Sequence, residues 1–135
     1  MSDAIPPEEA VPVESPLLRR LYATREWSET QALLTDDFVW HDERGKRRRA
    51  KHLKHATQWS ERQLEDLHAT IEAIVADLEQ PTVLYVRDRT RGRTPHRDTL
   101  DLDVIAWTRV VIAPCGTRIR ELGPTIVIGR QKRHH

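Results

Sequence analysis

Apolar residues recur with a helical period in the N-terminal half of this chain and with a period of two in most of the C-terminal half. Ser15-Pro16 provides a cap and a proline for a first helical turn. One apolar stripe follows at helical spacing, made of Leu17, Leu18, Leu21 and Tyr22. It predicts a first helix that ends near Arg25. Ser28 and Gln31 then have the spacing of a capping box, which predicts a short second helix that ends at an Asp36-Asp37 turn.

The segment from Phe38 to Asp42 predicts a first strand directly after this turn. Its pleat places Phe38, Trp40 and Asp42 on one face and Val39 with His41 on the other. A carboxylate that shares a face with two large aromatic groups must reach water or lie in a partly dry pocket, where its pKa would rise. Asp42 is therefore the first candidate for a general base, and capping of the following turn is the alternative.

Residues 47–62 predict a third helix, because apolar side chains gather on one side of it and basic ones on the other. Residues 67–75 alternate as a half-buried strand does, although a helix is the alternative because Ala and Glu also suit one. Further strands are predicted over residues 82–90, 99–112 and 117–128. The short turns at 91–95 and 114–116 make these strands antiparallel hairpins.

These elements predict an α+β fold in which the helices cover one face of a bent sheet. We expect a single domain over residues 15–130. Residues 1–14 hold prolines and acidic groups with few bulky apolar side chains, which predicts a flexible tail. Residues 131–135 predict a basic C-terminal tail. A sheet bent around helices leaves an open end, and such mouths are where small ligands bind.

The balance of charge excludes one class of function and leaves a local question. The 135 residues include 22 Lys and Arg and 21 Asp and Glu, a formal net charge of +1, so the chain has no overall basic character that would indicate nucleic acid. A basic run lies between Lys46 and Lys54. We interpret it as a solvated helix face and consider nucleic-acid binding unlikely; steering of an anionic substrate is a further alternative.

Cys115 is the only cysteine, which excludes an intrachain disulfide and a multi-cysteine metal site. Histidines and carboxylates show no metal-ligand spacing, so we assign no metal. The N-terminus lacks the basic and apolar regions of a signal peptide, and no apolar run approaches the roughly 18 residues that span a bilayer. We therefore expect a cytoplasmic protein with no cofactor and no membrane partner.

Three stretches together resemble a known family. They are the helical lead-in over residues 17–34, the block Asp36-Asp37-Phe38-Val39-Trp40-His41, and the closing Cys115-Gly116-Thr117-Arg118-Ile119-Arg120-Glu121-Leu122. The pattern resembles the nuclear transport factor 2-like superfamily, in its SnoaL-like and ketosteroid-isomerase-like branch, over roughly residues 17–130. The resemblance implies a cone-shaped α+β barrel, with three N-terminal helices packed in the concavity of a strongly bent, mostly antiparallel sheet. Members include isomerases, polyketide cyclases, dehydratases and proteins with no established reaction.

The resemblance also implies site residues. In the isomerase branch the base is a carboxylate five residues after the second Asp of the acid pair, which is Asp42 here. The tyrosine that members carry on the first helix aligns by spacing with Leu18, while Tyr22 lies one turn further along the same face. Asp101 and Asp103 lie in the strand region where these enzymes hold a second, proton-bearing carboxyl group. The implied acid is Asp103, Tyr22 or a bound water.

Aromatic side chains are candidates for the walls of the pocket, with core filling as the alternative. The set is Trp27, Trp40, Trp59, Tyr85 and Trp107. We expect Trp40 and Trp107 to line the pocket, while Trp59 could lie in the cavity or on the surface. Leu18 and Tyr85 complete the expected ligand-binding set. His41 and His68 could hold a proton near neutral pH, and an exposed or hydrogen-bonded imidazole is the alternative.

The sequence therefore predicts a protein that binds a small apolar organic molecule in a pocket, as a homodimer through the outer face of its sheet. If the protein is an enzyme, we expect cofactor-free proton transfer of the isomerase, cyclase or dehydratase kind. The alternative is a non-catalytic ligand-binding or dimeric assembly module of the same fold.

Overall fold

The computed structural model describes residues 4–93 and 101–133. This part of the chain contains three helices, α1 Pro16–Ala23, α2 Trp27–Ala32 and α3 Ala50–Gln63. It also contains seven strands, β1 Val11–Pro12, β2 Leu34–His41, β3 Arg47–Arg48, β4 Glu65–Ala76, β5 Val83–Arg93, β6 Asp101–Ile112 and β7 Ile119–Arg133. The predicted α+β class is confirmed.

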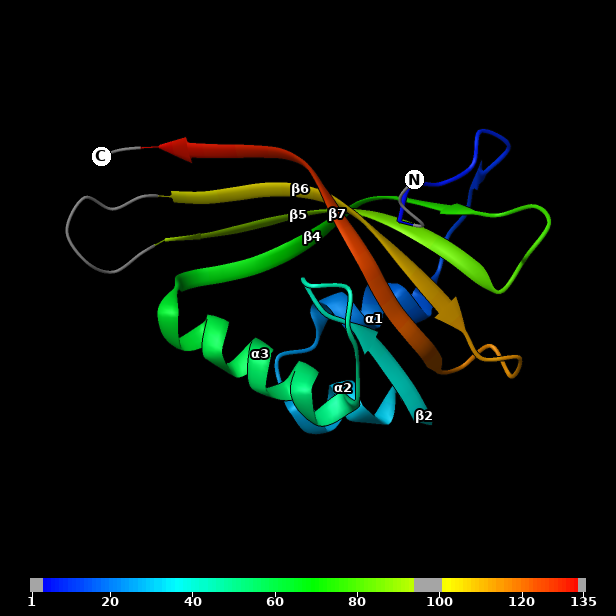
Figure 1. Ribbon diagram of the computed structural model, residues 1–135, viewed down its shortest axis with the longest axis horizontal. Coiled ribbons are helices and arrows are strands. Elements are labelled where there is room, and N and C mark those ends of the chain that lie inside the picture. Colours follow the sequence, from blue (N-terminus) through cyan, green and yellow to red (C-terminus); the bar gives the residue numbers. More distant parts are fainter. Residues whose placement is uncertain (1–3, 94–100, 134–135) are drawn as a thin grey trace.

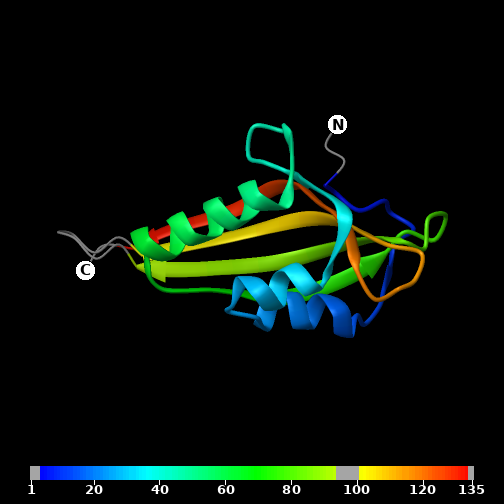
Figure 2. The same ribbon diagram turned by 90° about the horizontal axis from the view of Figure 1, so that it is seen from below.

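The strands form one sheet in the order β1-β4-β5-β6-β7-β2-β3. Every pair of neighbours is antiparallel except β2 and β7, which are parallel. The long strands β4 to β7 twist strongly across one another, and the three helices lie on one side of them (Figures 1 and 2). We call the face toward the helices the inner face and the opposite one the outer face. No helix of the described residues is long and apolar enough to cross a membrane.

The first helix forms as its sequence predicts. Ser15 caps it by accepting a hydrogen bond from the Leu18 amide at 3.2 Å, and Pro16 opens the first turn. Leu18 is fully buried, while Leu17, Leu21 and Tyr22 pack against the core at its edge. The apolar stripe therefore decides which side of α1 meets the sheet.

The start of the second helix and the turn after it differ from the prediction. Glu26 stands at the N-cap of α2, so the capping box expected at Ser28 does not form. Asp36 and Asp37 are exposed residues within β2 and do not form a turn. The strand begins at Leu34, because Leu34 pairs with Ile119 of β7 and burying these two residues outweighs the turn preference of the acid pair.

The core is a single cluster on the inner face. Its buried members are Leu18, Leu34, Phe38, Ile74, Leu84, Val86, Val110 and Ile119. Along β5 the pleat turns Leu84, Val86 and Asp88 to the inner face, and Arg87 and Arg89 to the outer face. Asp88 is therefore a carboxyl group that continues an apolar row.

Both terminal segments contain sheet structure where flexible tails were expected. Within residues 1–14, Val11 pairs with Ala76 and Pro12 with Val75, which adds β1 to the edge of β4. Within residues 131–135, strand β7 continues to Arg133 opposite Asp101. Backbone pairing orders these polar segments without any need for a buried side chain. The end of the turn predicted at 91–95 and the start of the strand predicted at 99–112 lie outside the described residues, as do His134 and His135.

Candidate functional site

Asp42 does not point toward indole rings in a cavity, so the geometric premise for it as a base is wrong. Its Oδ1 accepts hydrogen bonds from the amides of Arg44 and Lys46, and its Oδ2 accepts one from the Arg48 guanidinium at 3.1 Å. Hydrogen bonding, first from the Lys46 amide and then from Arg48, holds the pKa of Asp42 below its usual range. The strand ends at His41, so Asp42 caps the hairpin to β3, the alternative that the sequence left open.

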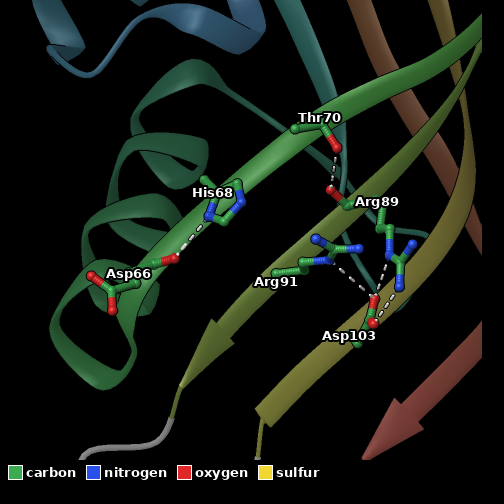
Figure 3. A network of polar contacts seen from close by, with 6 residues as sticks. All are labelled: Asp66, His68, Thr70, Arg89, Arg91 and Asp103. Atoms are coloured by element: carbon green, nitrogen blue, oxygen red, sulfur yellow. Dashed lines mark hydrogen bonds and ion pairs between the residues drawn. The ribbon is translucent and has the colours of Figure 1, made fainter.

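Asp103 lies on the outer face, away from the helices. Arg89 donates to both of its carboxylate oxygens, at 2.7 and 2.6 Å, and Arg91 lies 3.9 Å away (Figure 3). The pleat of β6 explains the error, because Val104, Ala106 and Thr108 take the inner positions. Asp103 therefore belongs to an ion-pair group on the outer face. The backbone of Asp101 begins β6, and its side chain lies outside the described part of the structure.

The expected pocket walls are dispersed over the molecule. Trp107 pairs across the sheet with Arg87, and Tyr85 with Arg109, so both aromatic residues lie on the outer face. Trp59 is 58% exposed on α3. These three placements contradict a common cavity. Leu18 and Trp40 lie on the helix side and pack in or against the core cluster, which is the alternative that the sequence left open for the aromatic residues.

The inner face brings Tyr22 of α1 and Asp88 of β5 together. The Tyr22 hydroxyl donates to Asp88 Oδ2 at 2.6 Å, and the Thr108 hydroxyl lies 3.3 Å from the same oxygen. Thr108 also contacts Thr125 Oγ1 at 3.0 Å, so neutral hydroxyl groups surround the carboxyl. Asp88 is only 8% exposed. Tyr22 was expected at the site, whereas Asp88 was not singled out.

Burial governs the protonation of this pair. Burial raises the pKa of Asp88, and the charge of Glu72 raises it further. The hydrogen bonds from Tyr22 and Thr108 lower it again, but by less than burial raises it. Burial, and next the charge of Asp88, raise the pKa of Tyr22 well above its usual value. Tyr22 therefore keeps its proton, while Asp88 is a carboxyl group whose proton affinity burial increases.

A cavity of about 290 Å³ reaches this pair at the end of α1. Its walls come from α1 with Tyr22, from α3 with Thr57 and Ser60, and from the sheet with Ala69 and Thr90. Tyr22 is thus the member of the pair that a ligand would touch, and Asp88 lies behind it. We call this space the inner cavity.

A larger, mainly apolar cavity of about 710 Å³ lies near the start of α1, between Leu17, Pro81 and Ile112. Its walls do not include the Tyr22 and Asp88 pair, so its size alone does not make it the site. Among the described residues, no group of three His, Cys, Asp or Glu side chains could hold a metal ion. His68 lies on the outer side of β4, where its Nδ1 is 2.9 Å from the Asp66 carbonyl oxygen.

Comparison with known families decides the assignment. Residues 17–116 match the model of the SnoaL-like domain. The chain belongs to the SnoaL-like family, within the nuclear transport factor 2-like superfamily. The family supports a protein that binds a small molecule in this fold. No curated protein matches the sequence. The expected homodimer and the cytoplasmic location stay predictions.

Sequence reasoning missed Asp88, although a signal was present. Leu84, Val86 and Asp88 stand at alternating positions of a predicted strand, where an acidic residue on an apolar face indicates a buried carboxyl group. This row was overlooked because Arg87, Arg89 and Arg91 occupy the intervening positions and make the segment look exposed. Only the pairing of strands shows which of the two alternating sets is buried.

Proposed function

We propose that this SnoaL-like protein binds a small organic molecule in the inner cavity and transfers a proton through Tyr22 to Asp88. The observation that carries the proposal is the 2.6 Å hydrogen bond from the Tyr22 hydroxyl to a buried carboxyl group whose pKa is raised. Family membership supports the pocket, and the residues of this chain support the chemistry.

The Tyr22 hydroxyl already donates its proton to Asp88, and its oxygen, which also interacts with the Thr108 hydroxyl, has a further lone pair that can accept a proton from a ligand. In the proposed step, a carbon next to a carbonyl group gives its proton to Tyr22 Oη, and Tyr22 passes its own proton to Asp88 Oδ2. The ligand is left as an enolate, and returning the proton to a different carbon completes an isomerisation. Positioned proton transfer of this kind contributes about 10²–10⁴-fold in rate.

A non-catalytic role for the same residues is the competing proposal. The pair ties α1 to β5, and the Thr108 and Thr125 hydroxyls complete a hydrogen-bonded group that could simply secure the helix on the sheet. In that case the inner cavity binds a ligand passively. Both proposals predict that loss of the pair destabilises the protein, and only the first predicts that the pair accelerates a reaction.

Exchange of carbon-bound protons separates them without knowledge of the natural substrate. Cyclohexanone and 3-cyclohexenone are incubated with the protein in D₂O, and loss of the signals next to the carbonyl group is followed by proton NMR. The wild-type protein is expected to accelerate exchange, whereas Asp88→Asn and Tyr22→Phe are each expected to lose about a hundredfold or more of that acceleration.

The matched control is Asp103→Asn, which removes a carboxylate on the outer side of the neighbouring strand β6, where it pairs with Arg89. With this variant, the ketone protons are expected to exchange as fast as with the wild-type protein. Equal rates for wild type and Asp88→Asn, in folded protein with both ketones, would refute the proton transfer and leave the passive pocket.

A further inference from the structure

A second cavity lies on the outer face of the sheet, on the other side from the inner cavity. It measures about 930 Å³ and is lined by four parts of the chain, one of which is the connection between β4 and β5 with Asp77 and Gln80. The N-terminal segment over residues 5–7 forms one wall, the hairpin between β2 and β3 another, and the outer side of β5 to β7 the floor. Strand β5 contributes to both cavities, with its outer side here and its inner side near Tyr22, and the other elements that line the two cavities differ.

Three cationic or titratable side chains converge on one carboxylate in this cavity. His41 Nε2 donates to Glu121 Oε1 at 2.6 Å. The Arg109 and Arg47 guanidinium groups lie 3.8 and 3.9 Å from the same oxygen, too far for hydrogen bonds. Arg109 is only 23% exposed at its side chain. Two guanidinium groups thus share a single carboxylate that His41 already uses.

The donors of Arg109 are the unusual feature. Within residues 4–93 and 101–133, no hydrogen bond satisfies its guanidinium group, which has five N–H donors in a planar fork. The Arg109 nitrogens are not among the buried unsatisfied atoms of the described residues, so these donors reach solvent and are available to an anion that enters the cavity. The geometry of the fork matches the two oxygens of a carboxylate.

The backbone fixes the polar end of the cavity. Gly123 has a φ of +98°, and a Cβ atom there would lie 2.9 Å from both the Cβ and the carbonyl oxygen of His41. Only glycine permits this approach of β7 to β2, which brings His41 next to Glu121. The other acidic wall residue, Asp77, lies at the end of β4, where its Oδ1 accepts the Glu79 amide.

The rest of the wall is apolar. Tyr85 and Val83 are buried residues of the floor, and Pro6, Pro7 and Pro124 contribute around them. A ligand that satisfies both ends carries one negative group for the arginines and an apolar body for the tyrosine and prolines. We propose that this outer cavity binds a small organic carboxylate, held by Arg109 and Arg47. This site is independent of the function proposed for the inner cavity.

Titration of ¹⁵N-labelled protein with benzoate tests the proposal. The amide resonances of Tyr85, Arg109 and Glu121 are expected to shift and to saturate by about 10 mM benzoate, as a millimolar site does. Benzyl alcohol, which has the same ring without the charge, is expected to leave them unchanged. Acetate, which lacks the ring, is expected to bind more weakly than benzoate.

Variants assign the binding to the two arginines. Arg109→Gln is expected to weaken benzoate binding about tenfold, as loss of a charge-assisted hydrogen bond does. Arg47→Gln is expected to weaken it less, because Arg47 is 65% exposed and its charge is screened. Arg87→Gln is the matched control, since Arg87 lies on the same face and pairs with Glu72 outside the cavity.

Wild-type affinity in both Arg109→Gln and Arg47→Gln would overturn the proposal, and so would equal shifts with benzyl alcohol or an absence of saturation. If Arg109→Gln does not fold, the exposed Arg47→Gln variant decides alone. Asp88→Asn is expected to bind benzoate at the outer cavity as the wild type does. A failure there is thus distinguishable from failure of the proton transfer at Tyr22.

Discussion

The two faces of strand β5 place opposite chemistry on adjacent residues. Asp88 turns to the inner face, where hydroxyl groups of Tyr22 and Thr108 surround it and burial raises its pKa. Arg89 turns to the outer face, where Asp103 holds it through two short hydrogen bonds and raises the pKa of the guanidinium. One residue step along the strand separates a buried carboxyl group with a raised pKa from a fixed ion pair.

The comparison shows that the hydrogen-bond partners of a carboxyl group, more than its burial, decide whether its pKa is raised or lowered. Asp42 also has little exposed surface, with 11% of its side chain accessible, yet amide and arginine donors lower its pKa. Neutral hydroxyl groups around Asp88 stabilise the ionised form less than a guanidinium does. An acid suited to proton transfer is therefore found where the surrounding donors carry no charge.

The largest loss of stability is expected from a substitution in the hydrophobic core of the inner face. Phe38 is 2% exposed within the cluster that also contains Leu18 and Val86. Phe38→Ala is expected to lower the free energy of unfolding by about 3–5 kcal/mol, because it leaves a cavity as well as losing buried surface. Urea denaturation followed by circular dichroism measures it. A loss below about 1 kcal/mol would show that the inner face is not a packed core.

The next effect concerns the pair itself. Tyr22→Phe is expected to cost about 1–3 kcal/mol of unfolding free energy at neutral pH, because it removes a hydrogen bond to a buried carboxylate. Loss of that donor raises the pKa of Asp88 further, so the folded state binds its proton more tightly than the unfolded state does. The cost is therefore smallest below the unfolded pKa of aspartate and grows as pH rises through the folded value.

Urea denaturation of the wild type and Tyr22→Phe at a series of pH values measures this dependence. Asp88→Asn provides the background, since an amide cannot titrate: in that background the cost of Tyr22→Phe is expected to be independent of pH. A cost that shrinks as pH rises, or one that varies equally in both backgrounds, would contradict the assigned role of Asp88.

The smallest effect is expected on the outer face. Asp103→Asn removes the partner of Arg89, and the loss of stability is expected to be roughly half or less of that caused by Tyr22→Phe, because 26% of the Arg89 side chain is exposed and water can replace part of the lost partner. Molar salt should abolish most of the difference from the wild type. Thermal unfolding at low and high salt provides the measurement. A large effect that salt does not reduce would remove the contrast between the faces.

Much of the fold could be predicted from local pattern. The apolar stripe of α1 and the alternation of β4 were sufficient to predict these two elements. In each of them one face is more buried than the other, and the period of the apolar residues shows which kind of element it is. The start of β2 was not, since it depends on pairing with Ile119 from the far end of the chain. The β1 segment was missed for the same reason: its order comes from backbone bonds to β4.

The site was harder to predict than the fold. Tyr22 was identified because it lies on the same stripe as Leu18, and its position follows from helical spacing. Asp42 was placed by alternation within a single strand, Asp103 by the family resemblance and Trp107 as one of the aromatic residues, and none of these arguments shows which face of the sheet meets the helices. Strand order and the β-bulges between β6 and β7 fix which face does so, and both are long-range properties.

The most direct test of the account is a carboxyl ¹³C NMR titration that follows Asp88 and Asp42 in one sample of the wild-type protein. The account predicts that Asp88 gains its proton well before Asp42 as the pH is lowered, with the pKa of Asp88 above the usual aspartate value and the pKa of Asp42 below it. Titration in the opposite order would contradict the assignment of a raised pKa to the carboxyl group on the inner face.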